Sequence, residues 1–404
     1  MQAPDVEEHD PFLAFNEAMN PGAIVDPYPD LARRRAEGPV QPITIDPALY
    51  DGPVGPIYEV LGYDAVQEVL RDAAAFSSAG YDDSIGPIMG HTILAMDEPE
   101  HRAYRSLVQQ AFSRKALESW ETELVVPTVD RLIDGFAGDG RADLVSRLFF
   151  PFPVYVIAGM LGLPPDDLPR FHRLAVELVS TAVDVDLARR ASEALAAYLL
   201  PFIAARREAP AGDVISVLAT AEQGGERLTD DEILAFCRLL LPAGAETTYR
   251  SSANLACALL GAPGRLDRLR ADRSLVPVAV EEGLRWEPPL LMVFRRATAD
   301  TEVGGVVIPE RARVVVNIGS ANHDETRWSD PERFDLDREV LGHVAFATGP
   351  HICLGMHLAR METRVVVERL LDRLPGLRLD PSAPPPAITG QMLRAPRRLE
   401  AVWD

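Results

Sequence analysis

The sequence predicts a mainly α-helical protein with small β-sheets, folded as one large domain. Amphipathic helical periodicity dominates from about residue 63 to about residue 290. Alternation typical of strands is confined to short stretches on either side of that region. The 404 residues, 47% of them hydrophobic, contain neither an internal repeat nor a linker long enough to divide domains. We therefore expect one large core.

The expected elements follow a polar, acidic stretch over residues 1–25, which we interpret as a flexible lead-in to a domain over 26–404. The alternating stretches 39–46 and 56–62 predict two strands around a turn rich in glycine and proline. Amphipathic helices come next, and we expect them over 63–76, 101–112, 117–136 and 168–206, the last with an irregular middle.

Residues 228–264 predict one very long helix. Thr229 and Glu232 have the spacing of a capping box at its start, and Gly261 and Pro263 end it. Some 32 helical residues would span roughly 48 Å, enough to cross a whole domain. The remaining chain predicts a helix, two strands and a final long helix over 277–286, 302–309, 311–318 and 354–373.

The charge balance limits the partners. There are 40 basic and 61 acidic residues, so the formal net charge is −21. Proteins that bind nucleic acid neutralise phosphates with Lys and Arg, so this balance argues against nucleic acid and against an anionic membrane surface as partners. Nearly all basic residues are arginine, and Lys115 is the only lysine.

The three cysteines, Cys237, Cys257 and Cys353, are too far apart for a disulfide framework or a zinc ribbon. The first residues lack the apolar core of a signal peptide, and no run of about 18 apolar residues predicts a membrane span. We therefore expect a reducing compartment and a cytoplasmic location.

The stretch "FATGPHICLGMHLAR", residues 346–360, places Cys353 between Gly349 and Gly355 at the start of the last helix. Glycines allow a backbone to approach a flat ligand closely, and the first amides of a helix can donate to a thiolate. The helix dipole adds only about 0.3–1 kcal/mol, whereas a metal ion ionises a thiol outright.

Two simpler interpretations of Cys353 compete with a metal thiolate. A free cysteine is usually a small core hydrophobe. A zinc site would use His351 and His357, but the sequence supplies no further nearby ligands. The flanking glycines favour the metal thiolate, because a buried structural cysteine does not need them.

The same stretch resembles the haem-binding signature of the cytochrome P450 superfamily, in its soluble bacterial form. The residues that match the signature are Phe346, Gly349, His351, Cys353, Gly355, Leu358 and Ala359. Ala347 stands where glycine is more usual, and we expect it to stiffen the loop. The resemblance implies a P450 fold and haem b (iron protoporphyrin IX), with Cys353 as the metal ligand.

A second stretch, "LPAGAETT", interrupts the long helix. Pro242 and Gly244 together cost roughly 4 kcal/mol in a helix interior, and threonine hydroxyls can bond to backbone carbonyls. A simple kink would explain this pattern, but Glu246 and Thr247 add an acid and a hydroxyl at the same place. The stretch resembles the family's oxygen-binding motif. Its matching residues are Ala243, Gly244, Glu246 and Thr247. The resemblance implies catalytic roles in which Glu246 relays protons and Thr247 helps to bind dioxygen.

Glu282 and Arg285 are spaced as an i, i+3 ion pair on one helix face, a pattern that is common and says little by itself. With Arg333 they match the family's structural ion cluster, which braces the loop leading to the cysteine.

The resemblance also implies basic contacts to the two haem propionates. The matching residues are His101, Arg105, Arg295 and His351. Arg296 is adjacent to Arg295, so the sequence leaves open which of the two meets a propionate.

The implied activity is that of a monooxygenase, which activates O2 with external electrons and hydroxylates a hydrophobic small molecule such as a terpenoid, steroid, fatty acid or aromatic. Candidate pocket residues are Ile88, Met89, Leu239, Leu291, Val293 and Met392, each of which would fit equally well in a plain core. The sequence has no flavin or ferredoxin segment, so we expect a ferredoxin-type donor with its reductase. Arg360 and Arg114 are candidate contacts to it, or simple surface charges.

Three alternatives remain open. The first is a haem-thiolate enzyme of other chemistry, driven by peroxide or catalysing coupling or isomerisation. The second is a non-catalytic haem sensor, and the third is a helical scaffold without haem. The Glu246–Thr247 pair argues against a peroxide-driven enzyme and a sensor, and the glycines around Cys353 argue against a scaffold.

Overall fold

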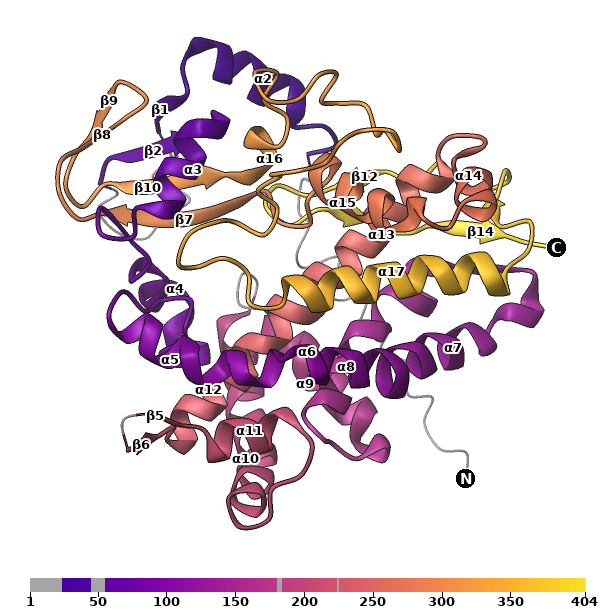
Figure 1. Cartoon of the computed structure of the whole chain (residues 1–404), viewed down its shortest axis with the longest axis horizontal. Coiled ribbons are helices and arrows are strands. Elements are labelled where there is room, and N and C mark those ends of the chain that lie inside the picture. Colours follow the sequence, from indigo (N-terminus) through magenta and orange to yellow (C-terminus); the bar gives the residue numbers. More distant parts are fainter. Residues whose placement is uncertain (1–23, 45–54, 180–183, 224) are drawn as a thin grey trace, which may run out of the picture.

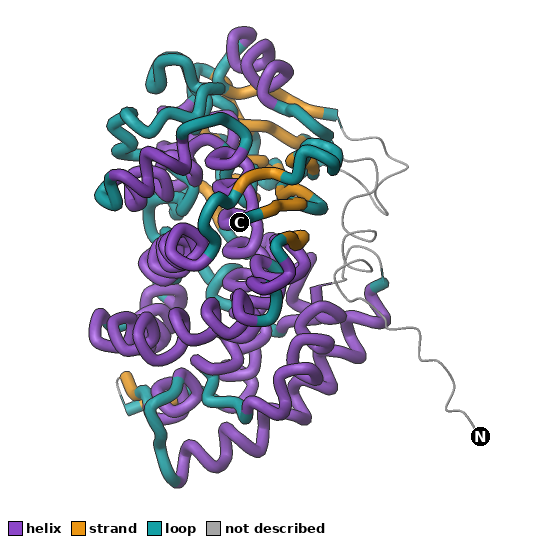
Figure 2. The backbone as a smooth tube through the Cα atoms, turned by 90° about the vertical axis from the view of Figure 1, so that its right-hand side faces the viewer, coloured by secondary structure: helices purple, strands orange, loops and turns teal. Residues whose placement is uncertain are grey.

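The computed structural model of the chain describes residues 24–44, 55–179, 184–223 and 225–404. Helices make up most of it, and most of the strands gather in the upper half of the molecule as drawn (Figures 1 and 2). The expected class, mainly α with small sheets, is confirmed. The expected lead-in over 1–25 lies almost wholly outside the described residues.

The α-helices are α2 (Tyr28–Glu37), α3 (Tyr63–Arg71), α4 (Gly80–Met89), α5 (Glu100–Val108), α6 (Arg114–Trp120), α7 (Val126–Asp134), α8 (Pro151–Met160), α9 (Leu168–Val179), α10 (Val185–Glu208), α11 (Val214–Thr220), α12 (Asp230–Leu240), α13 (Thr247–Leu260), α14 (Arg265–Ala271), α15 (Leu275–Trp286), α16 (Ile318–Ala321) and α17 (Met356–Arg373). Short π-helical segments are η3 (Glu121–Val125), η5 (Val145–Phe149) and η8 (Leu241–Glu246), and short 3-10 segments are η2 (Gln109–Phe112), η4 (Ala137–Asp139) and η6 (Pro165–Asp167).

The strands are β1 (Val40–Ile43), β2 (Ile57–Val60), β3 (Phe76–Ser77), β4 (Arg141–Asp143), β5 (Glu222–Gln223), β6 (Glu226–Arg227), β7 (Met292–Ala297), β8 (Thr301–Val303), β9 (Val306–Ile308), β10 (Arg313–Asn317), β11 (Arg378–Leu379), β12 (Ile388–Thr389), β13 (Ala395–Pro396) and β14 (Glu400–Val402).

The largest sheet has the strand order β1-β2-β10-β7-β3. β10 runs parallel to β2 and antiparallel to β7. Its core face packs on α3 through fully buried apolar side chains such as Val66 and Val314. This sheet fixes β7, and with it Arg295, next to the loop that carries Cys353.

The long helix is continuous from Asp230 to Leu260 through α12, η8 and α13. Its predicted start is confirmed, because Thr229 and Glu232 form a complete capping box. In Figure 1 the helix passes behind α17, against which α13 packs. The helix and α17 therefore bring the "LPAGAETT" and "HICLG" stretches into one region of the core.

The structure differs from the sequence-based expectation at several elements. The strands expected over 302–309 pair with each other as a β8–β9 hairpin, whereas β10 joins the main sheet. Helices α2, α4 and α8 and strand β7 were not expected. α8 is apolar on nearly every side and almost wholly buried, so its sequence has no polar face to reveal a helical period.

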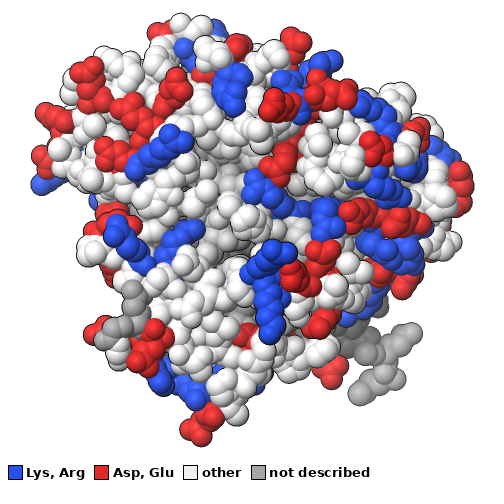
Figure 3. All heavy atoms as spheres, in the orientation of Figure 1, with Lys and Arg blue, Asp and Glu red and all other residues white. Residues whose placement is uncertain are grey.

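Ion pairs join α17 to α7 across the face drawn in Figure 1. Arg369 and Arg373 of α17 both bind Asp130 of α7, at 2.8 and 3.0 Å, and Arg373 also binds Asp134. Figure 3 shows acidic and basic side chains interleaved over this part of the face, and a mostly uncharged area beside it. Every helix in the described part of the chain is too short or too polar to cross a lipid bilayer.

Candidate active site

Cys353 lies at the end of a loop, just before α17 begins at Met356. Its backbone N–H donates to the Phe346 carbonyl at 2.9 Å, so the loop folds back on itself. The backbone N–H of Gly355 hydrogen-bonds to the sulfur. An amide at the start of the helix therefore points at the sulfur, as the sequence predicted.

The glycine at 349 is required by the packing of this loop. Its φ of +77° is in the left-handed region, and a Cβ there would overlap the Leu70 carbonyl oxygen at the end of α3. Ala347 also has a positive φ, +57°, which costs a residue with a Cβ about 1–2 kcal/mol. The departure from glycine at 347 thus leaves a strained residue in the loop.

The Cys353 thiol differs from the other two in its surroundings. Cys237 and Cys257 are buried, and burial raises the pKa of each thiol to about 12. Cys353 is accessible by surface area. Burial nevertheless raises its pKa, while the Gly355 amide and the Arg105 and Arg360 guanidinium groups oppose that rise. Cys353 is thus the accessible thiol of the three, although protein atoms surround it closely enough to raise its pKa.

The four basic residues expected to meet propionates converge beside this loop. The rings of His101 and His351 lie 4.1 Å apart between centroids. Burial, followed by the charges of Arg295, His101 and Arg105, lowers the pKa of His351 to about 3. Arg295, His101 and Arg105 are therefore all close enough to His351 to disfavour its protonation.

Few acidic groups offset this gathering of basic side chains. Arg105 donates to the Ile352 carbonyl at 2.7 Å, and the buried Arg295 donates to the carbonyl of Phe294 at 2.7 Å. His101 Nε2 is buried and has no hydrogen-bond partner among the described residues, although its Nδ1 lies 3.4 Å from Glu98. Buried cations need anions, so this cluster fits a ligand with two carboxylates.

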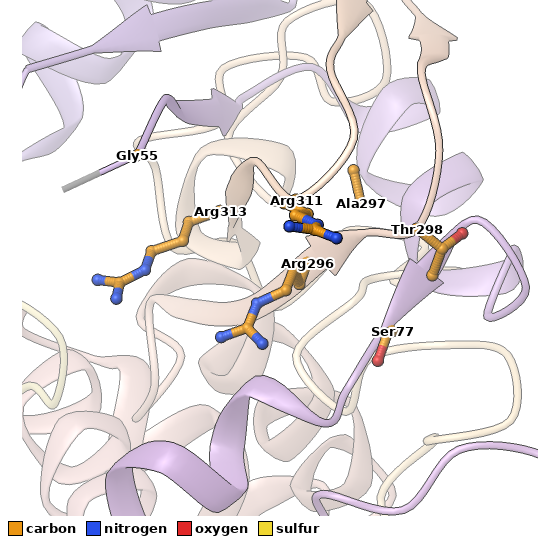
Figure 4. A pocket seen from close by; sticks show the side chains of 7 residues that line it. All are labelled: Gly55, Ser77, Arg296, Ala297, Thr298, Arg311 and Arg313. Atoms are coloured by element: carbon orange, nitrogen blue, oxygen red, sulfur yellow. The ribbon is translucent and has the colours of Figure 1, made fainter. Parts of the chain in front are cut away.

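Arg296 belongs to a different surface. It binds Asp83 at 2.7 Å and, with Arg311 and Arg313, lines a pocket of about 470 Å³ at the side of the main sheet (Figure 4). Successive residues of a strand point to opposite faces. Arg295 thus faces the His101–His351 side, whereas Arg296 faces this surface pocket.

The Ala243–Thr247 motif falls on the π-helical turn η8 and the start of α13. Ala243 is exposed and Thr247 partly so, although Leu241 and Thr248 beside them are buried. One face of the helix is therefore open within the protein. Gly244 lets η8 approach α8, because a Cβ there would lie 3.1 Å from Ile157 Cδ1.

The two polar residues of the motif are both engaged. The Thr247 hydroxyl donates to the Ala243 carbonyl at 2.7 Å, one turn back. The Glu246 carboxylate accepts from Arg250 Nη2 at 2.7 Å, and both side chains are buried. The resemblance implied a proton relay at Glu246, and the structure holds its carboxylate in an ion pair. The i, i+4 spacing of Glu246 and Arg250 was the signal for it.

Sequence reasoning also missed Glu362, on the buried face of α17. Its Oε2 accepts from the Thr248 hydroxyl at 3.2 Å. Burial raises the pKa of Glu362 to about 8, against the smaller effect of the Thr248 hydrogen bond. A carboxyl group that is mostly protonated near neutral pH therefore contacts Thr248, the residue that follows Thr247 in the chain.

The structural ion cluster is present but differs in one member. Glu282 and Arg285 form a fully buried pair at 2.7 Å. The expectation for Arg333 is wrong, because its side chain is exposed and binds Asp335 instead. Arg338 fills the position, with Nε 3.1 Å from Glu282 and its side chain 8% exposed. Arg333 contributes only its carbonyl, which accepts from Arg285 and Arg338.

The six candidate pocket residues separate into two groups. Leu239, Val293 and Met392 are partly or largely accessible. Ile88 and Met89 are 5% exposed and pack in the main helical core, and Leu291 is 1% exposed in a cluster with Tyr28 and Leu61. For Leu291 the plain core interpretation is the better one.

Of the candidate partner contacts, Arg114 is almost fully exposed and pairs only with Glu118 one turn away. Arg360 is only partly exposed and donates two hydrogen bonds to Glu281, at 2.6 and 2.9 Å. It is therefore less free for a partner than the sequence suggested. Lys115 is exposed next to Arg114.

Comparisons with known proteins agree on one family. The family model described as Cytochrome P450 matches residues 185–400. The chain is 36% identical over 380 residues to Cytochrome P450 monooxygenase PikC of Streptomyces venezuelae, covering 90% of this chain and 88% of that protein. It is 38% identical over 326 residues to Steroid C26-monooxygenase of Mycobacterium tuberculosis H37Rv, covering 78% and 81%.

Solved structures are similar over nearly the whole chain. CYP109E1 from Bacillus megaterium in complex with testosterone matches with a TM-score of 0.84 and 30% identity, covering 94% of this chain and 99% of that one. P450BioI in complex with acyl carrier protein ligated to hexadec-9Z-enoic acid matches with a TM-score of 0.82 and 30% identity, covering 94% and 98%.

Proposed function

The chain belongs to the cytochrome P450 family, and on that basis we propose how its residues hold haem b and support a monooxygenase reaction. Haem b, when bound through a thiolate, supplies the oxygen chemistry. The protein is an oxidoreductase that transfers one oxygen atom from O2 to an organic substrate. Its own residues supply ligation, orientation and protons.

Cys353 is the ligand to the haem iron in this proposal. One observation carries it: Cys353 is the accessible thiol of the three, held at the start of α17 by the Gly355 amide and faced by Arg105 and Arg360. The two guanidinium groups and the amide stabilise a sulfur anion. Glycine at 349 allows the loop that carries Cys353 to pack against the end of α3.

His101, Arg105, Arg295 and His351 hold the two propionates. Two carboxylates would balance the charges of Arg105 and Arg295 and would favour the protonated forms of the two histidines. They would also give His101 Nε2 a hydrogen-bond partner. Arg295, rather than Arg296, takes this role because Arg296 faces the opposite side of β7.

Thr247 accepts a hydrogen bond at the oxygen site, and Glu246 relays protons to that site. The single hydrogen of the Thr247 hydroxyl is used on the Ala243 carbonyl, so its oxygen is oriented as an acceptor. Thr247 could then accept a hydrogen bond at the oxygen site, but a proton must come from elsewhere. Glu246 can relay it from water: after its carboxylate leaves Arg250 Nη2, it can take up a proton from water and pass that proton on.

The substrate is a hydrophobic small molecule. Support comes from the apolar side chains that remain accessible, Leu239, Val293 and Met392, on elements near η8 and β7. The first compounds to test are steroids, followed by fatty acids, terpenoids and aromatics, because relatives at 30–38% identity carry steroid names or a bound steroid.

Electrons come from a ferredoxin-type donor with its reductase. Lys115 offers a direct test, because it is the only lysine of the chain and is exposed on α6. A carbodiimide joins lysine amines to carboxylates, so a bound acidic ferredoxin should cross-link to the wild type at Lys115. The Lys115→Arg variant keeps the charge and should lose that cross-link.

The ferrous carbonyl spectrum tests the central assignment. The wild type should give the strongly red-shifted Soret band of a thiolate-ligated haem with an open opposite position. Cys353→Ala should lose it, and Cys257→Ala, at a buried thiol, is the matched control. A Cys353→Ala protein that keeps both the band and substrate oxidation would refute the proposal.

Turnover driven by NADH through a ferredoxin system tests the roles of Thr247 and Glu246. Thr247→Ala should consume NADH with little product, whereas Thr247→Ser, which keeps the hydroxyl, should stay coupled. Equal coupling in both variants would remove Thr247 from the mechanism and would favour one of the other haem-thiolate chemistries.

A further inference from the structure

Three elements of the cysteine region meet at one carboxylate, that of Glu281. Glu281 lies on α15 next to the Glu282 of the buried ion cluster. It accepts two hydrogen bonds from Arg360 of α17, at 2.6 and 2.9 Å, and a third from His343 Nε2 at 3.0 Å. Burial alone would raise the pKa of Glu281, but His343 and Arg360 outweigh it and hold the pKa at about 2. Glu281 is therefore ionised at every working pH.

His343 fastens the start of the cysteine loop to this carboxylate. Its side chain is 3% exposed, and both ring nitrogens are used. The Ala345 N–H donates to Nδ1 at 3.2 Å, so Nε2 carries the proton that is donated to Glu281. The imidazole is thereby fixed in one tautomer and one orientation.

Arg360 connects the same carboxylate to the sulfur end of the loop. Its guanidinium carbon lies 4.5 Å from the centre of the Phe346 ring, within the range of a cation–π contact. The Phe346 carbonyl in turn accepts the Cys353 N–H. Phe346 thus connects the Arg360 guanidinium group to the backbone that carries the Cys353 sulfur.

These contacts give Arg360 a position that an ordinary surface arginine lacks. A free arginine side chain samples many rotamers and its charge is screened by water. Here Glu281 holds two of its nitrogens and Phe346 lies against its plane, so the charge is held in one place beside the cysteine loop. A fixed charge in a partly buried place acts on a neighbouring anion far more strongly than a mobile one.

We propose that Arg360 is a positioning residue for reduction of the haem, held by Glu281 so that its positive charge stabilises the Cys353 thiolate and makes reduction easier. This inference rests on the proposed function, because it requires Cys353 as the ligand. Reduction adds one electron from the donor protein and no proton, so the haem–thiolate unit becomes more negative. A nearby fixed cation favours that reduced form.

The ion pair predicts effects of opposite sign on the reduction potential. Arg360→Gln removes the cation and leaves Glu281 unbalanced, so the potential should become more negative. Glu281→Gln leaves the cation unbalanced, so the potential should become more positive, by less because Glu281 lies behind Arg360. A purely structural role would give both variants the same direction, since each breaks the same contacts.

The measurement is a spectroelectrochemical titration of the substrate-free holoenzyme with redox mediators. Arg360→Lys keeps the charge and should lie closer to the wild type than Arg360→Gln does. Arg364→Gln is the matched control. Arg364 lies one turn further along α17, is similarly half-buried and is also held by carboxylates, those of Glu121 and Glu368, but has no contact with Phe346 among the described ones. Its potential should equal that of the wild type.

The same sample separates this inference from the proposed function. If the wild-type ferrous carbonyl spectrum lacks the red-shifted band, Cys353 is not the ligand and the proposed function fails first. If the band is present, equal shifts in Arg360→Gln and Arg364→Gln, or the same direction in Arg360→Gln and Glu281→Gln, would overturn the role of Arg360. Should Arg360→Gln not retain haem, Arg360→Lys and Glu281→Gln decide: no positive shift in Glu281→Gln overturns the inference.

Discussion

Glu362 and Thr248 face each other between α17 and α13, with the threonine hydroxyl 3.2 Å from Glu362 Oε2 and both side chains buried. Burial raises the pKa of Glu362 to about 8, well above the usual value of 4.5. The folded protein therefore binds a proton here that the unfolded chain has lost between about pH 4.5 and pH 8. Stability from this group is complete below the lower value and decreases as the pH rises through the upper one.

Replacing Glu362 by Gln should remove this pH dependence. The amide keeps an oxygen that can accept from Thr248 and has no proton to lose. Between pH 5 and pH 7 the wild type should lose about 1–3 kcal/mol of unfolding free energy relative to Glu362→Gln. Urea unfolding at the two pH values measures it. Parallel pH profiles for the two proteins would show that Glu362 titrates normally.

The correction at the ion cluster gives a direct comparison between two arginines. Arg338→Gln removes a buried partner of Glu282 and should cost about 3 kcal/mol. Arg333→Gln removes an exposed pair with Asp335 and should cost under about 1 kcal/mol. Thermal unfolding of the two holoenzymes measures the difference. The reverse order would restore Arg333 as the cluster member.

Glycine at position 347 should give a more stable protein than the alanine that stands there with a positive φ. Relief of the left-handed strain of about 1–2 kcal/mol exceeds the cost of a more flexible unfolded chain, about 0.4–1 kcal/mol. Ala347→Gly should therefore stabilise the protein by up to about 1 kcal/mol. Gly349→Ala is the contrasting variant: it adds strain and overlaps the Leu70 carbonyl, so it should be destabilised and retain less haem. A loss of stability in Ala347→Gly would contradict the strain argument.

Haem affinity should distinguish Arg295 from its neighbour. Arg295→Gln removes one charge-assisted contact to a propionate, worth about 1.5–3 kcal/mol, so haem should dissociate at least tenfold more readily. Arg296→Gln changes only the surface pocket and should leave haem affinity unchanged. Transfer of haem to excess apomyoglobin measures both. A larger loss in Arg296→Gln would reverse the assignment.

Much of the fold could be predicted because its signals are local. The capping box at Thr229 and the amphipathic pattern of α3 depend only on neighbours in sequence. The glycines around Cys353 could also be recognised from the sequence. At Gly349 the positive φ of the backbone requires glycine. The α8 helix escaped prediction, because a helix that is buried on nearly all sides has no polar face to give it a period.

The remaining site features depend on contacts between distant segments. Arg333 and Arg338 have the same chemistry and lie five residues apart, and only the path of the loop decides which guanidinium reaches Glu282. The sequence around Glu281 gives no signal of its role, because its partners His343 and Arg360 lie 62 and 79 residues further along the chain. The Glu246–Arg250 pair is different. Its i, i+4 spacing can be seen in the sequence, but the burial of both side chains cannot.

The π-helical turn η8, Leu241–Glu246, constrains how this protein can change by insertion or deletion. Removing one residue from it could restore regular α-helical winding, but it would rotate α12 against α13 by about 100°. Phe236 and Cys237 of α12 would then leave the core, or Thr247 would leave the accessible face. The number of residues across this irregular turn therefore cannot change by one without breaking either the α12 core contacts or the accessible face of α13.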